Sequence, residues 1–221
     1  MARMSSPREQ LVEAGIQVLE RDGLAALSAR KLAAETGTST MAVYTHFGGM
    51  SGLIEAIASE AFVRFTRALT IDESDDPVAD FFVLGMRYRE FALANPQRYQ
   101  LMFGTSAESL NRFFHADLTV TGSASARAEW AVSFEALLIA VRRMIAAGRI
   151  RDDDEAAIAG RMWSINHGTV LLEMAGFFGH EGHGMSQILG PLAVDALVGM
   201  GDEREKTMAS LATAVAVMFG P

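Results

Sequence analysis

One stretch near the start of the chain constrains its fold most, because it places two helix starts and a tight turn close together. Ser28 is a favourable N-cap, since its hydroxyl can accept from the unpaired N–H groups of a first helical turn. Gly37 can adopt the left-handed conformation that ends a helix without a Cβ clash. Ser39 can cap a second helix, in which Val43 and Phe47 repeat at i and i+4 and share a buried face. The stretch predicts two helices joined by a turn.

The second of these helices keeps a small polar and aromatic set away from its buried face. This set comprises Thr40, Met41, Tyr44 and His46. Ala33 is small where two helices would cross, and with the glycine turn and the buried valine it completes the pattern of a helix-turn-helix. In that motif the second helix lies in the DNA major groove, with base contacts from its first residues and hydroxyl groups on phosphates. An ordinary helical hairpin has similar spacing, so the pattern alone leaves both interpretations open.

The sequence Gly37-Thr-Ser-Thr-Met-Ala-Val-Tyr-Thr-His-Phe47, followed by Leu53, resembles the signature of the TetR family of bacterial transcriptional regulators. The similarity to the DNA-binding domain of that family extends over residues 8–60. It implies contacts with base edges from the start of the second helix and contacts with phosphate from its later residues. The predicted DNA-binding residues are Ser28, Arg30 and Thr38, then Ser39, Thr40 and Met41 at or near base edges, and Tyr44 and His46 on phosphate.

This sequence departs from the family pattern after the His-Phe pair. Many members carry a lysine there, whereas this chain has Gly48 and Gly49. The departure predicts one phosphate contact fewer and leaves the strength of DNA binding open.

The net charge of −8 is unevenly distributed along the chain. Residues 1–50 are neutral overall, so the remainder carries the whole −8. A neutral DNA-binding domain forms few phosphate ion pairs, and its affinity must depend on dimerisation and uncharged donors as well. Arg3 and Arg8 precede or open the first helix, and by the same resemblance a basic N-terminal arm could reach a phosphate or the minor groove. A solvated, disordered tail is the alternative.

Composition excludes several other classes of protein. The 221 residues include no cysteine, which rules out disulfides, cysteine nucleophiles and CxxC redox sites. We find neither the apolar core of a signal peptide nor an apolar run of membrane-spanning length. No Gly-x-Ser-x-Gly elbow or phosphate-binding glycine loop is present. These features predict a soluble cytoplasmic protein that is not an enzyme, has no cofactor and makes no membrane contact.

The chain divides at an acidic run, Asp72-Glu-Ser-Asp-Asp-Pro77, where one helix can stop and another can start. We expect an all-α protein of about nine helices. A three-helix helix-turn-helix domain at residues 1–50 precedes a connecting helix at 51–71 and a larger bundle at 72–221 for ligand sensing and dimerisation. Apolar periodicity predicts helices at 8–22, 51–71, 78–94, 126–147, 154–178 and 188–219, the last broken near Gly199-Met-Gly201.

Two stretches of the second domain resemble the ligand-sensing domain of one branch of the TetR family. They are residues 92–103 and Trp163-Ser-Ile-Asn-His-Gly168, the second being similar to the Trp-His-Gly element that names the branch. Trp163 and His167 are four residues apart and share a helix face, and Gly168 would allow a neighbouring helix to approach closely. An inducer of such a protein would bind between helices, where aromatic residues either line the pocket or pack the core. The predicted ligand-binding residues are Phe91, Phe103, Trp130, Phe134, Trp163 and His167.

One group of side chains has the chemistry of a metal site. It comprises His167, His180 and His183 with Glu173 and Glu181, and His180-x-x-His183 has usable ligand spacing on a helix. The latter two histidines lie among glycines in a predicted surface link. Solvated histidines are therefore the preferred interpretation, and no metal site is predicted.

We therefore expect a ligand-responsive, DNA-binding transcriptional regulator. Its partners would be a near-palindromic double-stranded DNA operator, a second copy of the chain and a small apolar or amphipathic effector, because one helix-turn-helix reads too few bases for useful specificity. The effector would splay the two recognition helices and release a repressor from DNA. Two alternatives stay open: a helical dimer that binds small molecules without recognising DNA, and a metal-dependent hydrolase built on a helical bundle.

Overall fold

The computed structural model describes residues 6–104, 116–179 and 181–220 and divides the chain into two compact units. Unit 1 comprises Met1–Arg64 and Asn95–Phe114, and unit 2 comprises Phe65–Ala94 and His115–Pro221. The described ranges contain eleven α-helices and no strand, which confirms the all-α prediction with slightly more helices than the nine or so expected. Within the same ranges, none of the helices has the length and apolar character needed to cross a bilayer.

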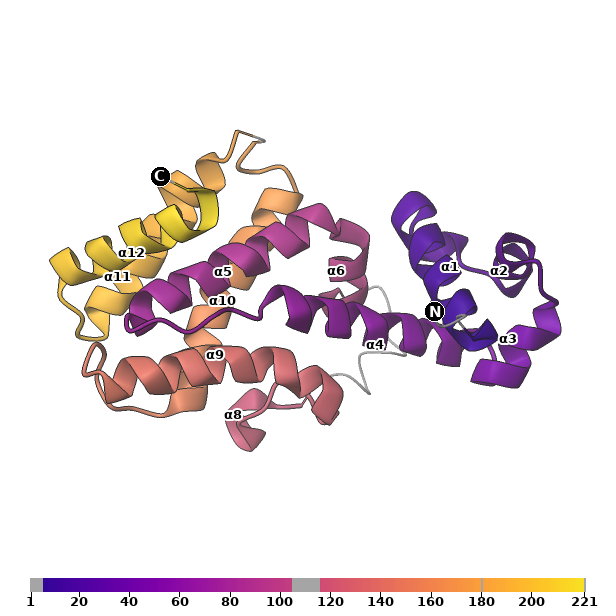
Figure 1. Ribbon diagram of the computed structural model, residues 1–221, viewed down its shortest axis with the longest axis horizontal. Helices are drawn as coiled ribbons and strands as arrows, with labels where there is room; N and C mark the ends of the chain where they lie inside the picture. The colour runs from indigo at the N-terminus through magenta and orange to yellow at the C-terminus, as the bar shows by residue number, and fades with distance from the viewer. Residues whose placement is uncertain (1–5, 105–115, 180, 221) are drawn as a thin grey trace. The chain divides into compact units, whose positions relative to one another are not determined.

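Unit 1 is a set of short helices packed around the apolar stripe of its first helix (Figure 1). Leu11, Ile16 and Leu19 are completely buried on that stripe. Gly15 lies between them, and a Cβ there would come within 2.4 Å of Ile57 Cδ1, so a larger residue would have to displace that side chain. The elements are α1 (Pro7–Asp22), a 3-10 turn at Leu24–Ala26, α2 (Ala29–Thr36), α3 (Thr40–Phe47), the part of α4 (Met50–Ala68) up to Arg64, and α6 (Pro96–Phe103).

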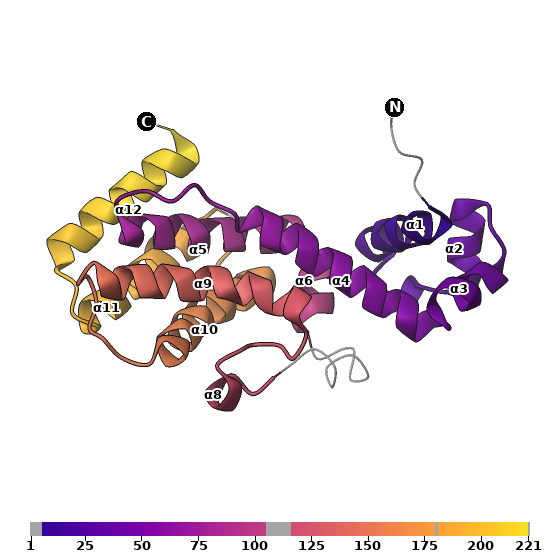
Figure 2. The same cartoon turned by 60° about the horizontal axis from the view of Figure 1, so that its bottom comes forward.

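Unit 2 is a helical bundle in which α5 packs against both α9 and α12, as Figures 1 and 2 show. α10 packs against α9 and α5. The core between these helices contains large side chains such as Trp130, Met144 and Ile158, each at most 2% exposed. The elements are α5 (Pro77–Ala94), α8 (Leu118–Thr121), α9 (Ala128–Ala146), α10 (Glu155–Met174), a π-helix at Gly184–Leu189, α11 (Gly190–Gly199) and α12 (Arg204–Phe219).

Most predicted helices are present, with two differences in unit 2. α10 ends at Met174, earlier than expected, because Gly176 follows with a positive φ of 86°. The final region begins with the unpredicted π-helix and then breaks, as expected, between α11 and α12, where Gly201 has a φ of 112°. The helix break at the acidic run is also present, since α5 begins at Pro77.

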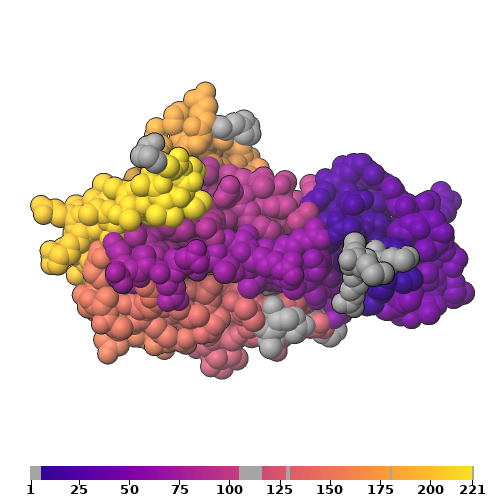
Figure 3. Space-filling view, viewed as in Figure 1, coloured from indigo at the N-terminus to yellow at the C-terminus, as the bar shows by residue number. Residues whose placement is uncertain are grey.

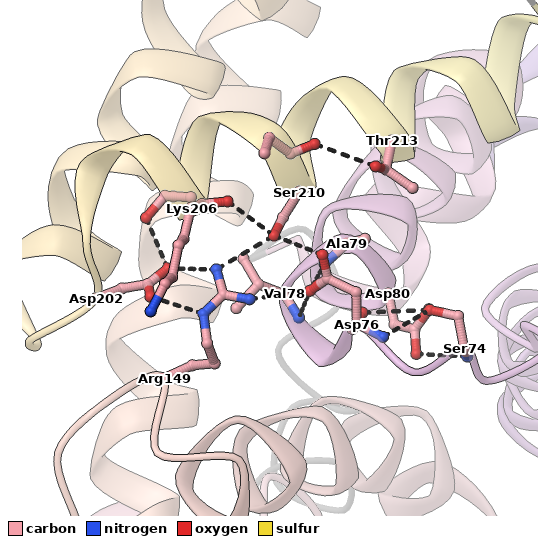
Figure 4. Close-up of polar contacts among 12 residues, drawn as sticks. Ser74, Asp76, Val78, Ala79, Asp80, Arg149, Asp202, Lys206, Ser210 and Thr213 are labelled. Carbon is pink, nitrogen blue, oxygen red and sulfur yellow. Dashed lines mark hydrogen bonds and ion pairs between the residues drawn. The ribbon is translucent and has the colours of Figure 1, made fainter.

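A network of charged and hydroxyl groups joins three loops of unit 2 (Figure 4). Arg149 donates to both carboxylate oxygens of Asp202, from Nε at 2.7 Å and from Nη2 at 2.8 Å. Arg149 Nη1 also donates to Asp76 Oδ1 at 3.2 Å, and Ser210 Oγ donates to Asp76 Oδ2 at 2.6 Å. Burial alone would raise the pKa of Asp202, but hydrogen bonds from Arg149 and Thr207 outweigh it and lower that pKa. The network therefore fixes the start of α12 against the start of α5.

Candidate nucleic-acid interface and ligand site

The first helix of the predicted helix-turn-helix begins and ends where its sequence indicates. The Ser28 hydroxyl accepts from the backbone N–H of Lys31 at 3.3 Å and caps α2. Gly37 ends the helix in the left-handed conformation, with φ of 66°. The Thr38 hydroxyl lies 2.9 Å from that of Thr36, which in turn donates to the carbonyl of Leu32. The turn between α2 and α3 is thus held by its own backbone and hydroxyl groups.

α3 buries the residue that was expected to anchor it. Val43 is completely buried and Phe47 is partly buried. Ser39 occupies the N-cap position, but the expectation that its hydroxyl caps the helix is wrong, because the side chain makes no capping hydrogen bond. Its hydroxyl remains on the exposed surface of unit 1.

The predicted DNA-binding residues lie on α2, α3 and the turn between them, with side chains directed to the surface. Met41 is 66% exposed and Tyr44 57% exposed, although both are large side chains that a core could bury. The rest are also exposed except Thr38, which is half-buried. The predicted set comprises Ser28, Arg30, Thr38, Ser39, Thr40, Met41, Tyr44 and His46.

Most of the cations beside this surface form ion pairs with carboxylates. Arg21 pairs with Glu35 at 2.6 Å, and Lys31 pairs with Asp22 at 2.7 Å. Hydrogen bonds from Lys31 and then Arg21 lower the pKa of Asp22. Arg30 is exposed and forms no ion pair with any residue that the structure describes. The local surface is therefore close to neutral, as its sequence predicted.

The glycine pair after α3 has a structural role. Gly48 caps α3 with a φ of 71°, and Gly49 follows with a φ of 135° and is buried. A side chain at either position would be strained, since L residues rarely adopt these conformations. The turn from α3 into α4 therefore favours glycine at both positions.

In unit 2, two of the predicted ligand-binding residues meet at a buried tyrosine. Trp163 Nε1 donates to the hydroxyl of Tyr88 at 3.1 Å, and that hydroxyl lies 3.0 Å from His167 Nδ1. An indole N–H can only donate, so the tyrosine oxygen accepts there and its own proton is available to the imidazole. Burial lowers the pKa of His167, which favours the neutral ring that this arrangement requires.

The sequence prediction did not include Tyr88 among the ligand-binding residues. Its phenol lies among the mostly apolar buried residues of α5 and is 7% exposed. A buried tyrosine hydroxyl requires a hydrogen-bond partner, and this requirement was the available signal. The partners themselves lie 75 and 79 residues away in the sequence.

Of the other predicted ligand-binding residues, Phe134 contacts this cluster, and the remaining three have other ring or cation neighbours. Phe134 contacts Trp163 edge to face, with ring centroids 5.9 Å apart, whereas Phe91 packs on Phe65. Trp130 is 2% exposed beneath the guanidinium of Arg127. Phe103 belongs to unit 1, where its ring packs against Tyr99 and Phe62.

Gly168 does not have the role expected for it. A Cβ at this position would meet no described atom within 4 Å, so no neighbouring helix approaches closely there. The glycine of the Trp-His-Gly element is therefore not explained by helix crossing in unit 2.

The side chains of the metal-like set are dispersed. Arg89 Nε donates to Glu173 Oε2 at 2.8 Å, and Glu173 is 7% exposed, so this carboxylate is held in an ion pair. His183 is exposed with Glu181 at 3.9 Å, and His180 lies outside the described residues. Across the described part of the chain, no three His, Asp or Glu side chains are placed to hold a metal ion.

Comparison with known sequences identifies the family from both ends of the chain. Residues 11–57 match the profile of the bacterial regulatory proteins of the tetR family. Residues 81–189 match the tetracyclin repressor-like C-terminal domain. The chain belongs to the TetR family. That family comprises helix-turn-helix transcriptional regulators and is not one of enzymes.

Two curated TetR-like relatives show how far the sequence similarity extends. The nicotine-responsive transcriptional repressor HdnoR of Paenarthrobacter nicotinovorans is 35% identical over 71 residues, which are 31% of this chain and 37% of that protein. The transcriptional regulator Rv1816 of Mycobacterium tuberculosis is 29% identical over 154 residues, 67% of this chain and 61% of the relative. The match thus spans less than two thirds of either relative.

Solved structures share the fold over nearly the full chain. A protein of unknown function from Rhodococcus sp. RHA1 is 26% identical with a TM-score of 0.72, over 91% of this chain and 98% of that one. RolR without ligand is 12% identical with a TM-score of 0.62, over 92% of this chain and 95% of that chain, and RolR has also been solved with resorcinol. At that identity the likeness to RolR concerns the fold alone.

Proposed function

We propose that this TetR protein binds a near-palindromic DNA operator as a homodimer and represses transcription until a small apolar or amphipathic molecule binds unit 2. The observation that carries the proposal is the exposure of one face of α3. Val43 is buried and holds this helix against unit 1, while Met41 and Tyr44 are more than half exposed beside polar neighbours. A rigid helix with an exposed polar and aromatic set suits the major groove.

The predicted DNA-binding residues then divide by their position. Ser39, Thr40 and Met41 begin α3 and would meet base edges, where hydroxyl groups accept or donate and a methionine contacts apolar base surface. The Ser39 hydroxyl makes no capping hydrogen bond and is therefore available to a base edge, which supports this role. Tyr44 and His46, further along α3, would contact phosphates on either side of the groove.

The proposal of a homodimer is supported by an apolar stripe on α12. Met208, Val215 and Phe219 are 49%, 42% and 72% exposed and recur at i, i+7 and i+11, on one side of the helix. Ser210 and Ala214 lie on the buried side. α12, yellow in Figure 3, runs along the surface of unit 2. A second copy would cover the stripe and set the distance between two recognition helices.

The proposed effector site is the cluster of Tyr88, Trp163 and His167 with Phe134. Its hydrogen-bonding groups are a phenol, an indole and a neutral imidazole, so a ligand with an apolar body and an uncharged polar group suits it best. The Trp-His-Gly similarity of this helix supports the same assignment, and we propose that the chain belongs to that branch. Phe91 and Trp130 remain predicted members of this site, whereas Phe103 lies in unit 1 and is not included in it.

We propose that the three segments predicted from the sequence have different functions. Residues 1–50 would bind DNA, 51–71 would connect, and 72–221 would sense ligand and dimerise. An effector with higher affinity for the state with splayed recognition helices would lower DNA affinity by that difference in affinity.

The DNA-binding proposal is tested by selection from a pool of random duplex DNA with the purified protein at moderate salt. We expect enrichment of an inverted repeat whose half-sites are about one helical turn, or a multiple of it, apart. A folded dimer that enriches no site would contradict the proposal and support the helical small-molecule-binding dimer instead.

The effector proposal is tested with the two tryptophans, both of which lie in unit 2. A panel of small aromatic and amphipathic compounds, with resorcinol and nicotine among them, is screened by tryptophan fluorescence and by release of the selected DNA. We expect a compound that does both and is ineffective on Trp163→Phe. If saturating compounds that bind unit 2 leave DNA affinity unchanged, the linkage mechanism fails although DNA recognition stands.

A further inference from the structure

The lysine and arginine side chains described in unit 1 fall into two groups. One group is committed to carboxylates within the unit, whereas Arg8 and Arg30 are exposed and form no ion pair with any described residue. The committed cations among the described residues are Arg21, Lys31, Arg64 and Arg98. Only uncommitted cations can neutralise DNA phosphates without first breaking an internal pair.

Arg8 is uncommitted, but it is held in place. Its guanidinium carbon lies 5.1 Å from the centroid of the Phe47 ring at the end of α3, within the range of a cation–π interaction. A capping box fixes the turn that carries it: Ser6 N donates to Glu9 Oε2 at 2.7 Å, and Glu9 N donates to Ser6 Oγ at 3.2 Å. A guanidinium stacked on a ring can still direct its N–H donors toward an anion.

The end of α3 beside Phe47 offers space for an anion. Gly48 and Gly49 contribute no side chain, and a Cβ on Gly48 would meet no described atom within 4 Å. Arg8 on α1 places a guanidinium beside this end of α3. Tyr44, a proposed phosphate contact, lies one helical turn before Phe47 on the same helix.

We propose that Arg8, positioned by Phe47, is a phosphate-binding residue of the DNA interface. The inference rests on the proposed function. Of the two alternatives left open for the start of the chain, it selects the phosphate contact and assigns it to Arg8 of α1, with Phe47 as the positioning residue. The described part of unit 1 then presents two uncommitted arginines in each subunit of a dimer. Each neutralised phosphate contributes about 0.9 to the slope of log affinity against log salt, so the two copies of Arg8 account for roughly 1.8.

The test compares Arg8→Gln with Arg21→Gln. Both substitutions remove one exposed arginine charge from unit 1, but Arg21 already holds Glu35 and Asp22. The probe is the inverted-repeat duplex that the wild-type protein enriches, and affinity is measured by fluorescence anisotropy over a range of salt. We expect Arg8→Gln to weaken binding and to lower the slope by about 1.8, and Arg21→Gln to keep the wild-type slope.

Two further variants separate charge from position. Arg8→Lys keeps the charge without the planar stack, and Phe47→Leu keeps the arginine without the ring. We expect Arg8→Lys to retain most of the slope, and Phe47→Leu to lower the affinity and part of the slope, with helical content unchanged by circular dichroism.

Equal slopes for the wild type, Arg8→Gln and Arg21→Gln would overturn the role of Arg8, while the enriched operator would leave the proposed function standing. Equal losses in the two glutamine variants would also overturn it, because net charge rather than position would then explain the effect. If the wild-type protein enriches no site, the proposed function fails and this inference fails with it.

Discussion

The ion pairs described in unit 1 have exposed or half-buried carboxylates, whereas unit 2 also contains pairs whose carboxylate is buried. The side chains of Arg21 and Glu35 are 54% and 38% exposed, whereas those of Arg149 and Asp202 are 17% and 2% exposed. An exposed pair contributes little to stability, but removing one partner of a buried pair leaves an uncompensated charge. We therefore expect a change at an exposed pair, as at Arg21 in unit 1, to have little effect on folding, and a change at a buried pair of unit 2 to destabilise the bundle.

The largest effect that this comparison predicts comes from Arg149→Met. The substitution removes the two hydrogen bonds that Asp202 receives from the guanidinium and leaves that carboxylate buried without its counter-ion. We expect the free energy of unfolding to fall by about 3–5 kcal/mol, measured by urea denaturation.

Arg142→Met is the matched control for that substitution. Arg142 also holds two carboxylates, Glu135 and Glu155, but its side chain is 46% exposed. The cost should be less than about 1 kcal/mol. Equal losses for the two variants would contradict the distinction between buried and exposed pairs.

Acid should destabilise unit 2 through the same carboxylates. Burial alone would raise the pKa of Asp80, but hydrogen bonds from Arg143 and Ser74 outweigh it and lower the pKa, as occurs at Asp202. A carboxyl with a lowered folded pKa stabilises the fold above its unfolded pKa of about 3.9, and this contribution is lost as the pH falls through the folded value.

We therefore expect the urea midpoint of unit 2 to fall as the pH decreases below about 5, with part of the fall absent in Asp202→Asn. Parallel curves for the variant and the wild type between about pH 6 and pH 3 would show that Asp202 does not contribute to the acid sensitivity.

Alanine substitutions at two serines of unit 1 should distinguish an effect on stability from an effect on DNA recognition. Ser28→Ala removes the hydroxyl that accepts from Lys31 N and should cost about 1 kcal/mol of unfolding free energy. Ser39→Ala removes no capping hydrogen bond, so its cost should be within about 0.5 kcal/mol, while its affinity for the selected DNA falls. A larger loss of stability for Ser39→Ala than for Ser28→Ala would contradict these roles.

Local signals explain what could be predicted from the sequence. The Ser28 cap, the Gly37 turn and the buried Val43 each depend on residues within one or two helical turns, so spacing was sufficient to predict them. The conformation of one hydroxyl was not predictable in this way. Ser39 stands at the N-cap as expected, yet its side chain makes no capping bond.

The polar pairs of unit 2 depend on the tertiary fold. Helical periodicity predicts where α5, α10 and α12 lie, but it carries no information about which polar groups meet between them. Arg149 and Asp202 are 53 residues apart, and Tyr88 and His167 are 79 apart. Phe103 illustrates the same limit, since its sequence resembles the sensing domain while its ring packs within unit 1.

The central claim is that the exposed face of α3 recognises DNA, and a comparison of three proteins on the selected operator tests it most directly. The account predicts that Tyr44→Ala combined with His46→Ala loses specific binding while its urea midpoint stays near that of the wild type, because both side chains are exposed. Arg142→Met, altered in unit 2, should keep the wild-type affinity. Unchanged affinity in the folded double variant would contradict the claim.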